Sequence, residues 1–505
     1  MFGFGIWAFA CTIHAQPPPP SMTVRNLDVR TTVSGLNQPT SMAFIGPNDF
    51  FVLEKATGNV KRVTNGVVQG AVLDLAVNNA SERGLLGIAL HPNFPANRGV
   101  YLYWTCSAPP PPPENPFMPT EVECADQPRL GADTNNILAV PLLGNRVDRF
   151  TWNGSSLTFD QNLIKLRAFQ HDGAPTPPGQ GDEAQNPAGN HDGGIIRFGP
   201  DGKLYIIIGD NGRRGQLQNL PSGPTMTGLG PIMPDDQFGG PFPDDAHLTG
   251  SIFRLNDDGS VPSNNPFFTE GGNLAKVFAY GIRNSFGMAF DPESGHLWTQ
   301  ENGDDSFDEL NLIVRGSNGG WIQFMGPSNR LAEFKAIETS PPPLFGLQPL
   351  RWPPTRLANS PEEAFMRLFM LRGSHYSEPE FSWKFAVAPA GIGFMSSRGI
   401  GPQYEGDLFV GALRPTLEGG YLFHFNLTGN RNQIAVDSHD LQDRVADNLA
   451  KFDITESEEL LIGRNFGVGT DIQTGPNGNL YVVSLSNGAV YEIFRRRIGD
   501  GGPQL

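Results

Sequence analysis

A histidine and an aspartate stand at the two ends of one short unit of apolar residues. His191 precedes the apolar run 193–198, and Asp210 follows the run 203–208. Residues 199–202 between them are typical of a tight turn, with a proline that fixes φ and a glycine that accepts positive φ. The β-branched and aromatic residues on both sides predict two antiparallel strands, whose ends would bring imidazole and carboxylate together. Such a pair suits general-base chemistry, although a histidine that only bonds a backbone carbonyl also fits the pattern.

A second candidate site is the acidic loop at residues 301–309. Asp304, Asp305, Asp308 and Glu309 crowd into it beside a glycine. Dense oxygen donors around a glycine turn suit a hard cation such as calcium. The sequence therefore predicts a calcium site, with a solvated acidic loop as the alternative, and chelation is expected to lower thermal stability.

Short β-units recur along the chain and must position these residues. Apolar strand, turn and apolar strand follow one another at residues 39–63, 193–212, 287–303 and 470–495, and more weakly at two further places. The 61 glycines and 45 prolines indicate many short strands and turns. Six units predict an all-β fold, a six-bladed β-propeller with long inter-strand loops, although the repeats alone allow five to seven blades.

Composition narrows the class of partner. The chain has a net charge of -16 and a pI of about 5.0, which argues against nucleic acid or an anionic membrane surface. Beyond the N-terminus no run approaches the roughly 20 apolar residues of a membrane span, so no stable membrane insertion is expected.

The N-terminal composition predicts export and a simple domain plan. Residues 1–15 are expected to be a signal peptide, 16–30 a Pro-rich linker, 31–497 the propeller and 498–505 a disordered tail. The location would be secreted or periplasmic. In an exported chain Cys106 and Cys124 are expected to form a disulfide, with two free thiols as the alternative.

Long insertions interrupt the repeats at residues 105–135, 168–190, 213–247 and 325–380. Loops of this length are usually site walls or lids. One contains a helix signal, because Ser360 to Glu363 form a capping box with a proline in the first turn.

Six segments in the same order resemble the soluble quinoprotein glucose dehydrogenases and the aldose sugar dehydrogenases. They are residues 82–94, 190–212, 248–267, 280–298, 301–313 and 475–484. The resemblance implies a six-bladed propeller that binds pyrroloquinoline quinone (PQQ) over a calcium ion at its axial mouth. It also implies a small-molecule sugar substrate and an external electron acceptor.

The resemblance assigns roles to individual residues. His191 matches the catalytic base, Asp210 the acid that orients it, and Arg283 the arginine beside the quinone carbonyl. Other positions match contacts to cofactor, sugar and metal. The implied cofactor contacts are Arg283, Asn284, Asn211 and Arg414; the implied substrate contacts are Glu82, Asn190 and Trp383; the implied metal positions are the carbonyls of Gly303 and Asp304, with Asp308 and Glu309 in a structural ion site or as loop caps.

The chain departs from the family pattern at the cofactor contacts. Phe286 replaces a glutamine, and Val468 and Thr470 stand where two arginines meet the cofactor carboxylates. Each such bond contributes about 1.5–3 kcal/mol. The first hypothesis is PQQ-dependent oxidation of an aldose at C1 to the lactone, with His191 as base and calcium polarising the cofactor. The alternatives are a propeller that binds sugar or glycan without redox chemistry, and a hydrolase or lyase that uses His191 and the calcium loop.

Overall fold

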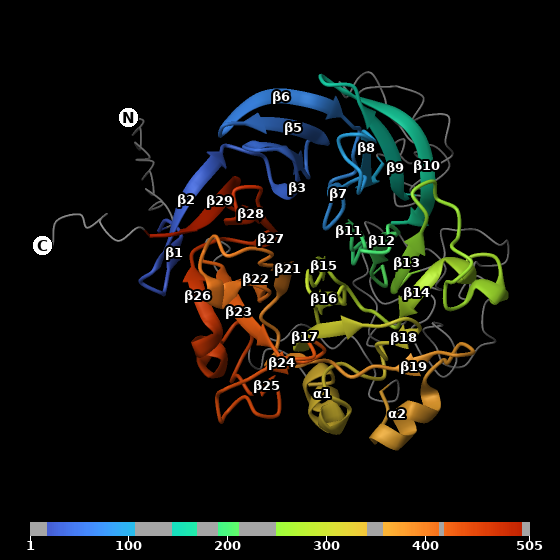
Figure 1. Cartoon of the computed structure of the whole chain (residues 1–505). Coiled ribbons are helices and arrows are strands. Elements are labelled where there is room, and N and C mark those ends of the chain that lie inside the picture. Colours follow the sequence, from blue (N-terminus) through green and yellow to red (C-terminus); the bar gives the residue numbers. More distant parts are fainter. Residues whose placement is uncertain are drawn as a thin grey trace, which may run out of the picture.

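The computed structural model describes residues 18–106, 144–168, 190–211, 249–340, 357–413 and 419–496. Their strands fall into six sheets that surround a common axis (Figure 1). The prediction of an all-β propeller is confirmed. The predicted signal peptide, Cys124, Arg414 and most of the four predicted insertions lie outside the described residues.

The first three sheets follow one another along the chain. The first contains β3 (Pro39–Gly46), β4 (Asp49–Glu54), β5 (Asn59–Thr64) and β6 (Val67–Asp74); the second β7 (Leu85–Leu90), β8 (Gly99–Thr105), β9 (Gly144–Trp152) and β10 (Leu157–Arg167); the third β11 (Ile196–Phe198), β12 (Leu204–Ile208), β13 (Ser251–Leu255) and β14 (Val277–Tyr280), extended by β18 (Ser317–Asn318) and β19 (His375–Tyr376).

The remaining three sheets complete the ring. The fourth contains β15 (Met288–Phe290), β16 (Leu297–Glu301), β17 (Ser306–Ile313), β20 (Phe381–Phe385) and β25 (Val445–Ala446); the fifth β21 (Pro389–Phe394), β22 (Leu408–Ala412), β23 (Tyr421–Leu427), β24 (Ile434–Ala435), β26 (Leu461–Arg464) and β1 (Ser21–Met22); the sixth β27 (Gly469–Thr474), β28 (Leu480–Ser484), β29 (Ala489–Arg495) and β2 (Leu27–Ser34).

The ring is closed by strands from both ends of the chain. β2 pairs antiparallel with β29, with Leu27 opposite Arg495, so the sixth sheet joins a strand near residue 30 to strands beyond residue 468. β1 likewise joins β26 of the fifth sheet. The predicted linker 16–30 is therefore wrong from Ser21 onward. β2 is the outer strand of the sixth sheet, and only its Leu27 and Val33 are buried.

β8 is almost entirely apolar because both of its faces are covered. Along β8, Leu102 and Trp104 pack into the core shared with the first sheet, whereas Tyr101 and Tyr103 pack against the third. All four side chains are fully buried. A continuous apolar run is the pattern expected of a strand between two packed layers.

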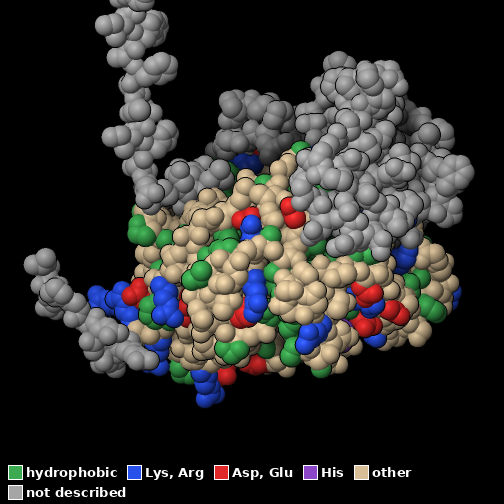
Figure 2. Space-filling model, turned by 90° about the horizontal axis from the view of Figure 1, so that it is seen from above, with side chains coloured by type: hydrophobic (Ala, Val, Ile, Leu, Met, Phe, Trp, Pro, Cys, Tyr) green, Lys and Arg blue, Asp and Glu red, His purple; other side chains and the backbone are tan. Residues whose placement is uncertain are grey.

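In the described part of the chain, two α-helices lie outside the ring of sheets, α1 (Leu331–Glu338) and α2 (Pro361–Arg367) (Figure 1). The predicted capping box begins α2, since the Ser360 side chain accepts a hydrogen bond from the Glu363 N–H. Over the part of the chain that is described, no helix combines the length and the apolar character that a membrane span requires. On the face seen in Figure 2, basic side chains are scattered among acidic ones.

Candidate active site

His191 and Asp210 meet at one end of the hairpin formed by β11 and β12, as the sequence predicts. The Nδ1 atom of His191 lies 2.6 Å from Oδ1 of Asp210, and both side chains are buried. Antiparallel pairing of the two strands places their outer ends side by side. Because the carboxylate accepts the Nδ1 proton, Nε2 is the basic nitrogen of this imidazole.

The backbone beside this pair leaves room only for glycine at position 209. A Cβ atom on Gly209 would lie 2.5 Å from the carbonyl oxygen of His191 and 2.6 Å from that of Arg283. The N–H of Asp210 donates to the same Arg283 carbonyl at 2.8 Å. Close backbone packing therefore joins the His191 hairpin to the segment that follows β14.

Glu82, just before β7, holds His191 through the backbone. Its Oε2 accepts hydrogen bonds from the His191 N–H at 2.6 Å and from Nδ2 of Asn284 at 3.0 Å. His191 has a φ of 57°, a left-handed conformation that most residues other than glycine rarely adopt. Glu82 thus stabilises the strained backbone that aims the imidazole.

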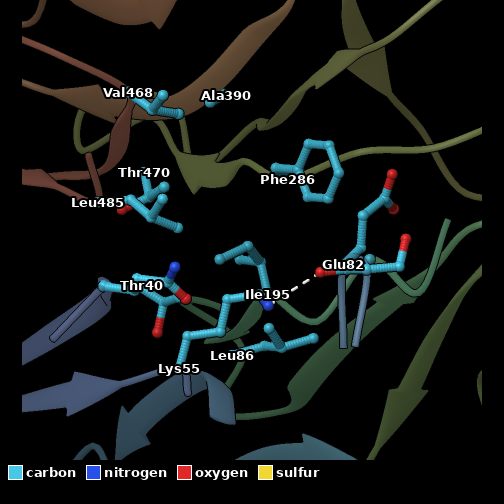
Figure 3. A pocket seen from close by; sticks show the side chains of 13 residues that line it. Thr40, Lys55, Glu82, Leu86, Ile195, Phe286, Ala390, Val468, Thr470 and Leu485 are labelled. Carbon is cyan, nitrogen blue, oxygen red and sulfur yellow. Dashed lines mark hydrogen bonds between the residues drawn. The ribbon is translucent and has the colours of Figure 1, made fainter. Parts of the chain in front are cut away.

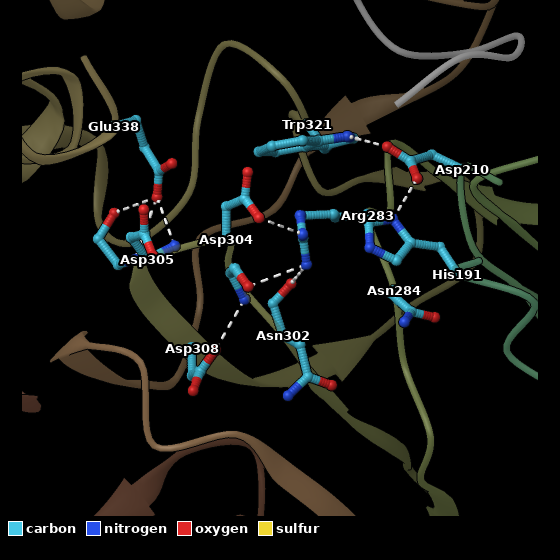
Figure 4. Close-up of polar contacts among 12 residues, drawn as sticks. His191, Asp210, Arg283, Asn284, Asn302, Asp304, Asp305, Asp308, Trp321 and Glu338 are labelled. Atoms are coloured by element: carbon cyan, nitrogen blue, oxygen red, sulfur yellow. Dashed lines mark hydrogen bonds and ion pairs between the residues drawn. The ribbon is translucent and has the colours of Figure 1, made fainter. Parts of the chain in front are cut away.

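Arg283 lies between the His191–Asp210 pair and the acidic loop (Figure 4). Its Nη2 donates to Oδ1 of Asp304 at 2.8 Å. Burial alone would lower the pKa of Arg283, but the carboxylates of Asp304 and Asp210 outweigh that effect and raise it. The guanidinium is therefore a fixed positive charge beside the His191–Asp210 pair.

Trp321, which follows β18, contacts both Asp210 and Arg283. Its indole Nε1 donates to Oδ2 of Asp210 at 2.7 Å, and its ring lies 5.6 Å from the Arg283 guanidinium carbon. The sequence analysis missed this residue, because no spacing rule links a tryptophan after β18 to an aspartate after β12.

Asp308 caps the acidic loop from inside, whereas the hydrogen-bond donors of Glu309 lie outside the loop. Asp308 accepts three backbone hydrogen bonds, from the N–H groups of Gly303, Val387 and Ala388 at 2.6–2.7 Å. Glu309 accepts one from Gly326. Burial raises the pKa of Asp308 to about 6 and that of Glu309 to about 7. The contacts of Asp308 fit the loop-cap alternative, and those of Glu309 do not. No group of three or more His, Cys, Asp or Glu side chains among the described residues is arranged to hold a metal.

A cavity of about 310 Å³ opens beside Glu82 (Figure 3). Its wall contains Phe286, Val468 and Thr470, the three positions at which the chain departs from the family pattern. The other lining residues are Gln38, Thr40, Lys55, Ser81, Glu82, Leu86, Gly193, Ile195, Ala390 and Leu485. Lys55 is the one cationic residue in this described lining, and its Nζ donates to the carbonyls of Asn79 and Ser81.

The remaining predicted contacts have mixed outcomes. Trp383 does not form part of the cavity wall: it is fully buried in the core between the fourth and fifth sheets, and its Nε1 donates to Ser457. The substrate contact predicted for it is wrong. Asn211 is buried, 3.5 Å from a carboxylate oxygen of Asp192, and the half-buried Asn190 is next to His191 in the chain.

Asp192 gives the site a testable pH response. Burial raises the pKa of its carboxyl to about 7, against the opposing effects of Arg83 and the Asn145 amide. A carboxyl group whose pKa is raised by folding stabilises the fold below its ordinary pKa, and this contribution is lost as the pH rises through about 7. We expect the melting temperature of the wild type to fall more between pH 5 and pH 8 than that of Asp192→Asn, by a few degrees. Parallel pH curves for the two proteins would contradict this assignment.

The chain matches the model of the glucose/sorbosone dehydrogenase family over residues 36–120 and 181–333. It is 30% identical over 314 residues to quinoprotein glucose dehydrogenase B of Acinetobacter calcoaceticus, and 27% identical over 309 residues to aldose sugar dehydrogenase YliI of Escherichia coli strain K12. These matches span 60% and 61% of this chain, and only 53% and 61% of the relatives' own lengths.

The fold is shared with a solved relative. The PQQ-bound aldose sugar dehydrogenase of Streptomyces coelicolor superposes with a TM-score of 0.52 at 22% identity, covering 95% of this chain and all of the other. At this identity the likeness concerns the fold. The resemblance predicted from the six sequence segments is confirmed by the family match.

Proposed function

We propose that this chain, whose residues 36–120 and 181–333 match the model of the glucose/sorbosone dehydrogenase family, oxidises an aldose sugar at C1 with PQQ as cofactor and an external electron acceptor. The observation that carries the proposal is the buried His191–Asp210 pair, whose Asp210 N–H donates to the carbonyl of the buried Arg283. We also propose that each of the six sheets is one blade of the propeller. The protein would be exported to a periplasmic or extracellular location.

His191 is the general base. Nδ1 is held by Asp210, so Nε2 accepts the proton of the sugar C1 hydroxyl as the C1 hydride leaves. A bound quinone would supply the hydride acceptor. Asp210, fixed in turn by Trp321, keeps the imidazole in the required tautomer and stabilises the imidazolium once it forms. The charge of Arg283 favours negative charge that develops on an oxygen nearby.

The cavity fits a flat aromatic cofactor better than it fits three carboxylates. Leu86, Ile195 and Phe286 supply apolar contact area, and Thr40 and Thr470 supply hydroxyl groups. Burial lowers the pKa of Lys55, with Glu82 acting in the opposite direction. Among the described lining residues PQQ would therefore meet one ammonium group, so we expect weaker binding than an arginine pair would give.

The same wall favours a second candidate function, the binding of a sugar or glycan without redox chemistry. Val468 and Thr470 line the cavity at the positions where the family has arginines. A site that no longer holds a tricarboxylate would still present hydroxyl, amide and carboxylate groups to a sugar.

Reconstitution separates the two functions. We expect PQQ added to the purified protein to bind in a calorimetric titration and to produce dye reduction when aldoses are supplied. Val468→Arg should tighten PQQ binding by about tenfold or more, because one charge-assisted bond contributes about 1.5–3 kcal/mol. Sugar binding without dye reduction, in both the wild type and Val468→Arg, would favour the second function.

A further inference from the structure

The loop between β16 and β17 presents a row of backbone carbonyl groups to two cationic side chains. Nη1 of Arg283 donates to the carbonyls of Asn302 and Gly303 at 2.7 and 2.9 Å. Nζ of Lys451 donates to the carbonyl of Asp304 at 3.2 Å. The two carbonyls at which the resemblance implies calcium, those of Gly303 and Asp304, thus each accept a hydrogen bond from a cation of the protein itself.

The carboxylates of the loop are engaged in the same way. Oδ1 of Asp304 accepts from Nη2 of Arg283 at 2.8 Å, and Oδ1 of Asp305 accepts from Nζ of Lys451 at 2.8 Å. Two aspartates therefore face two fixed positive charges. Burial raises the pKa of Asp308, and its backbone hydrogen bonds and, to a smaller extent, the charge of Lys451 oppose that rise.

Burial makes this arrangement hard for a metal ion to share. The side chains of Arg283 and Lys451 are only 5% and 11% exposed. Calcium binds its oxygen ligands at about 2.3–2.6 Å, so an ion on both carbonyls would lie next to both cations. Like charges repel strongly where water cannot screen them. A calcium ion could enter only by displacing at least one of the two side chains.

We propose that Lys451, together with Arg283, takes the place of a calcium ion in the loop 301–309, so that this loop is stabilised without bound metal. The inference goes beyond the proposed function, because it concerns the folded protein before any cofactor or sugar binds. The two cationic side chains would thus occupy the position for which the acidic residues of the loop predicted a calcium ion.

Thermal unfolding of the metal-stripped protein, with and without millimolar calcium, tests this inference. The melting temperature of the wild type should be the same in calcium and in excess chelator, within about 1 °C. Lys451→Met keeps the apolar stem and removes the charge; it should melt several degrees lower in chelator and recover at least half of that loss in calcium. Lys451→Gln serves the same purpose if the methionine variant does not fold.

Two control variants make the result specific. Lys451→Arg keeps the charge and should remain insensitive to calcium. Lys384→Met removes an ammonium group that pairs with Glu333 and Asp447 near the surface, and it should gain no calcium response. A wild type that binds one calcium ion per chain by elemental analysis, or that loses stability in chelator, would overturn the inference. So would charge-removing Lys451 variants that calcium does not stabilise. Neither result depends on PQQ or sugar, so this test can fail while the proposed function stands.

Discussion

His191→Asn is expected to lower the turnover of aldose oxidation by about 10²–10⁴-fold, the usual contribution of a general base. PQQ binding should be nearly unchanged, because His191 acts on the sugar proton. Asparagine is a better probe than alanine, since it tolerates the left-handed backbone at φ 57° and keeps the stabilising bond to Glu82. Turnover and melting temperature measured on the same samples would separate a catalytic effect from a structural one.

Asp210→Asn provides the comparison for this prediction. The amide can still lie against His191, but it cannot stabilise the imidazolium, so turnover should fall. The loss should be smaller than in His191→Asn, because the imidazole base itself is retained. Its melting temperature should also fall, because the carboxylate accepts the indole N–H of Trp321 as well. A His191→Asn protein that is fully active and merely destabilised would end the general-base mechanism.

Asp471→Ala is expected to lower the free energy of unfolding by about 3–5 kcal/mol, the usual cost of removing one partner from a buried ion pair. Asp471 is 1% exposed and binds the hydroxyl of Ser41 and Nη2 of Arg197, both at 2.6 Å. It therefore connects the sixth sheet with the first and the third. Urea unfolding monitored by intrinsic fluorescence measures the loss.

Asp49→Ala is the matched control for this stability effect. Asp49 pairs with Arg62 at 2.7 Å, but both side chains are partly exposed and both belong to the first sheet. Exposed pairs contribute about 0–1 kcal/mol, so this change should have little effect. Equal losses in the two variants would show that Asp471 has no special role in joining sheets.

The hairpin and the meeting of His191 with Asp210 could be predicted from the sequence, because both follow from local rules. Turn residues set the connection, and antiparallel pairing then determines which residues are neighbours. The β-unit repeats predicted the propeller class for the same reason, since each unit carries its own signal of strand and turn.

Contacts between distant segments could not be predicted in this way. Trp321 reaches Asp210 from another part of the chain, and Lys451 reaches the acidic loop from beyond β25. Trp383 shows that even within one strand the face on which a side chain lies can be mispredicted. Side chains alternate between the two faces of β20, so an alignment uncertain by one residue cannot decide between the core and the opposite face.

The pairing of β2 with β29 has a consequence for how the protein is made. Arg30 and Glu492, which form an ion pair across these strands, are 462 residues apart in the chain. At about 5–20 residues per second, the ribosome needs roughly 20–90 s between synthesising the first strand and its partner. During that time β2 emerges as an unpaired edge. The nascent chain can fold its middle sheets in order, but the ring closes only after β29 has been synthesised, so chaperones that shield strand edges should matter most at β2.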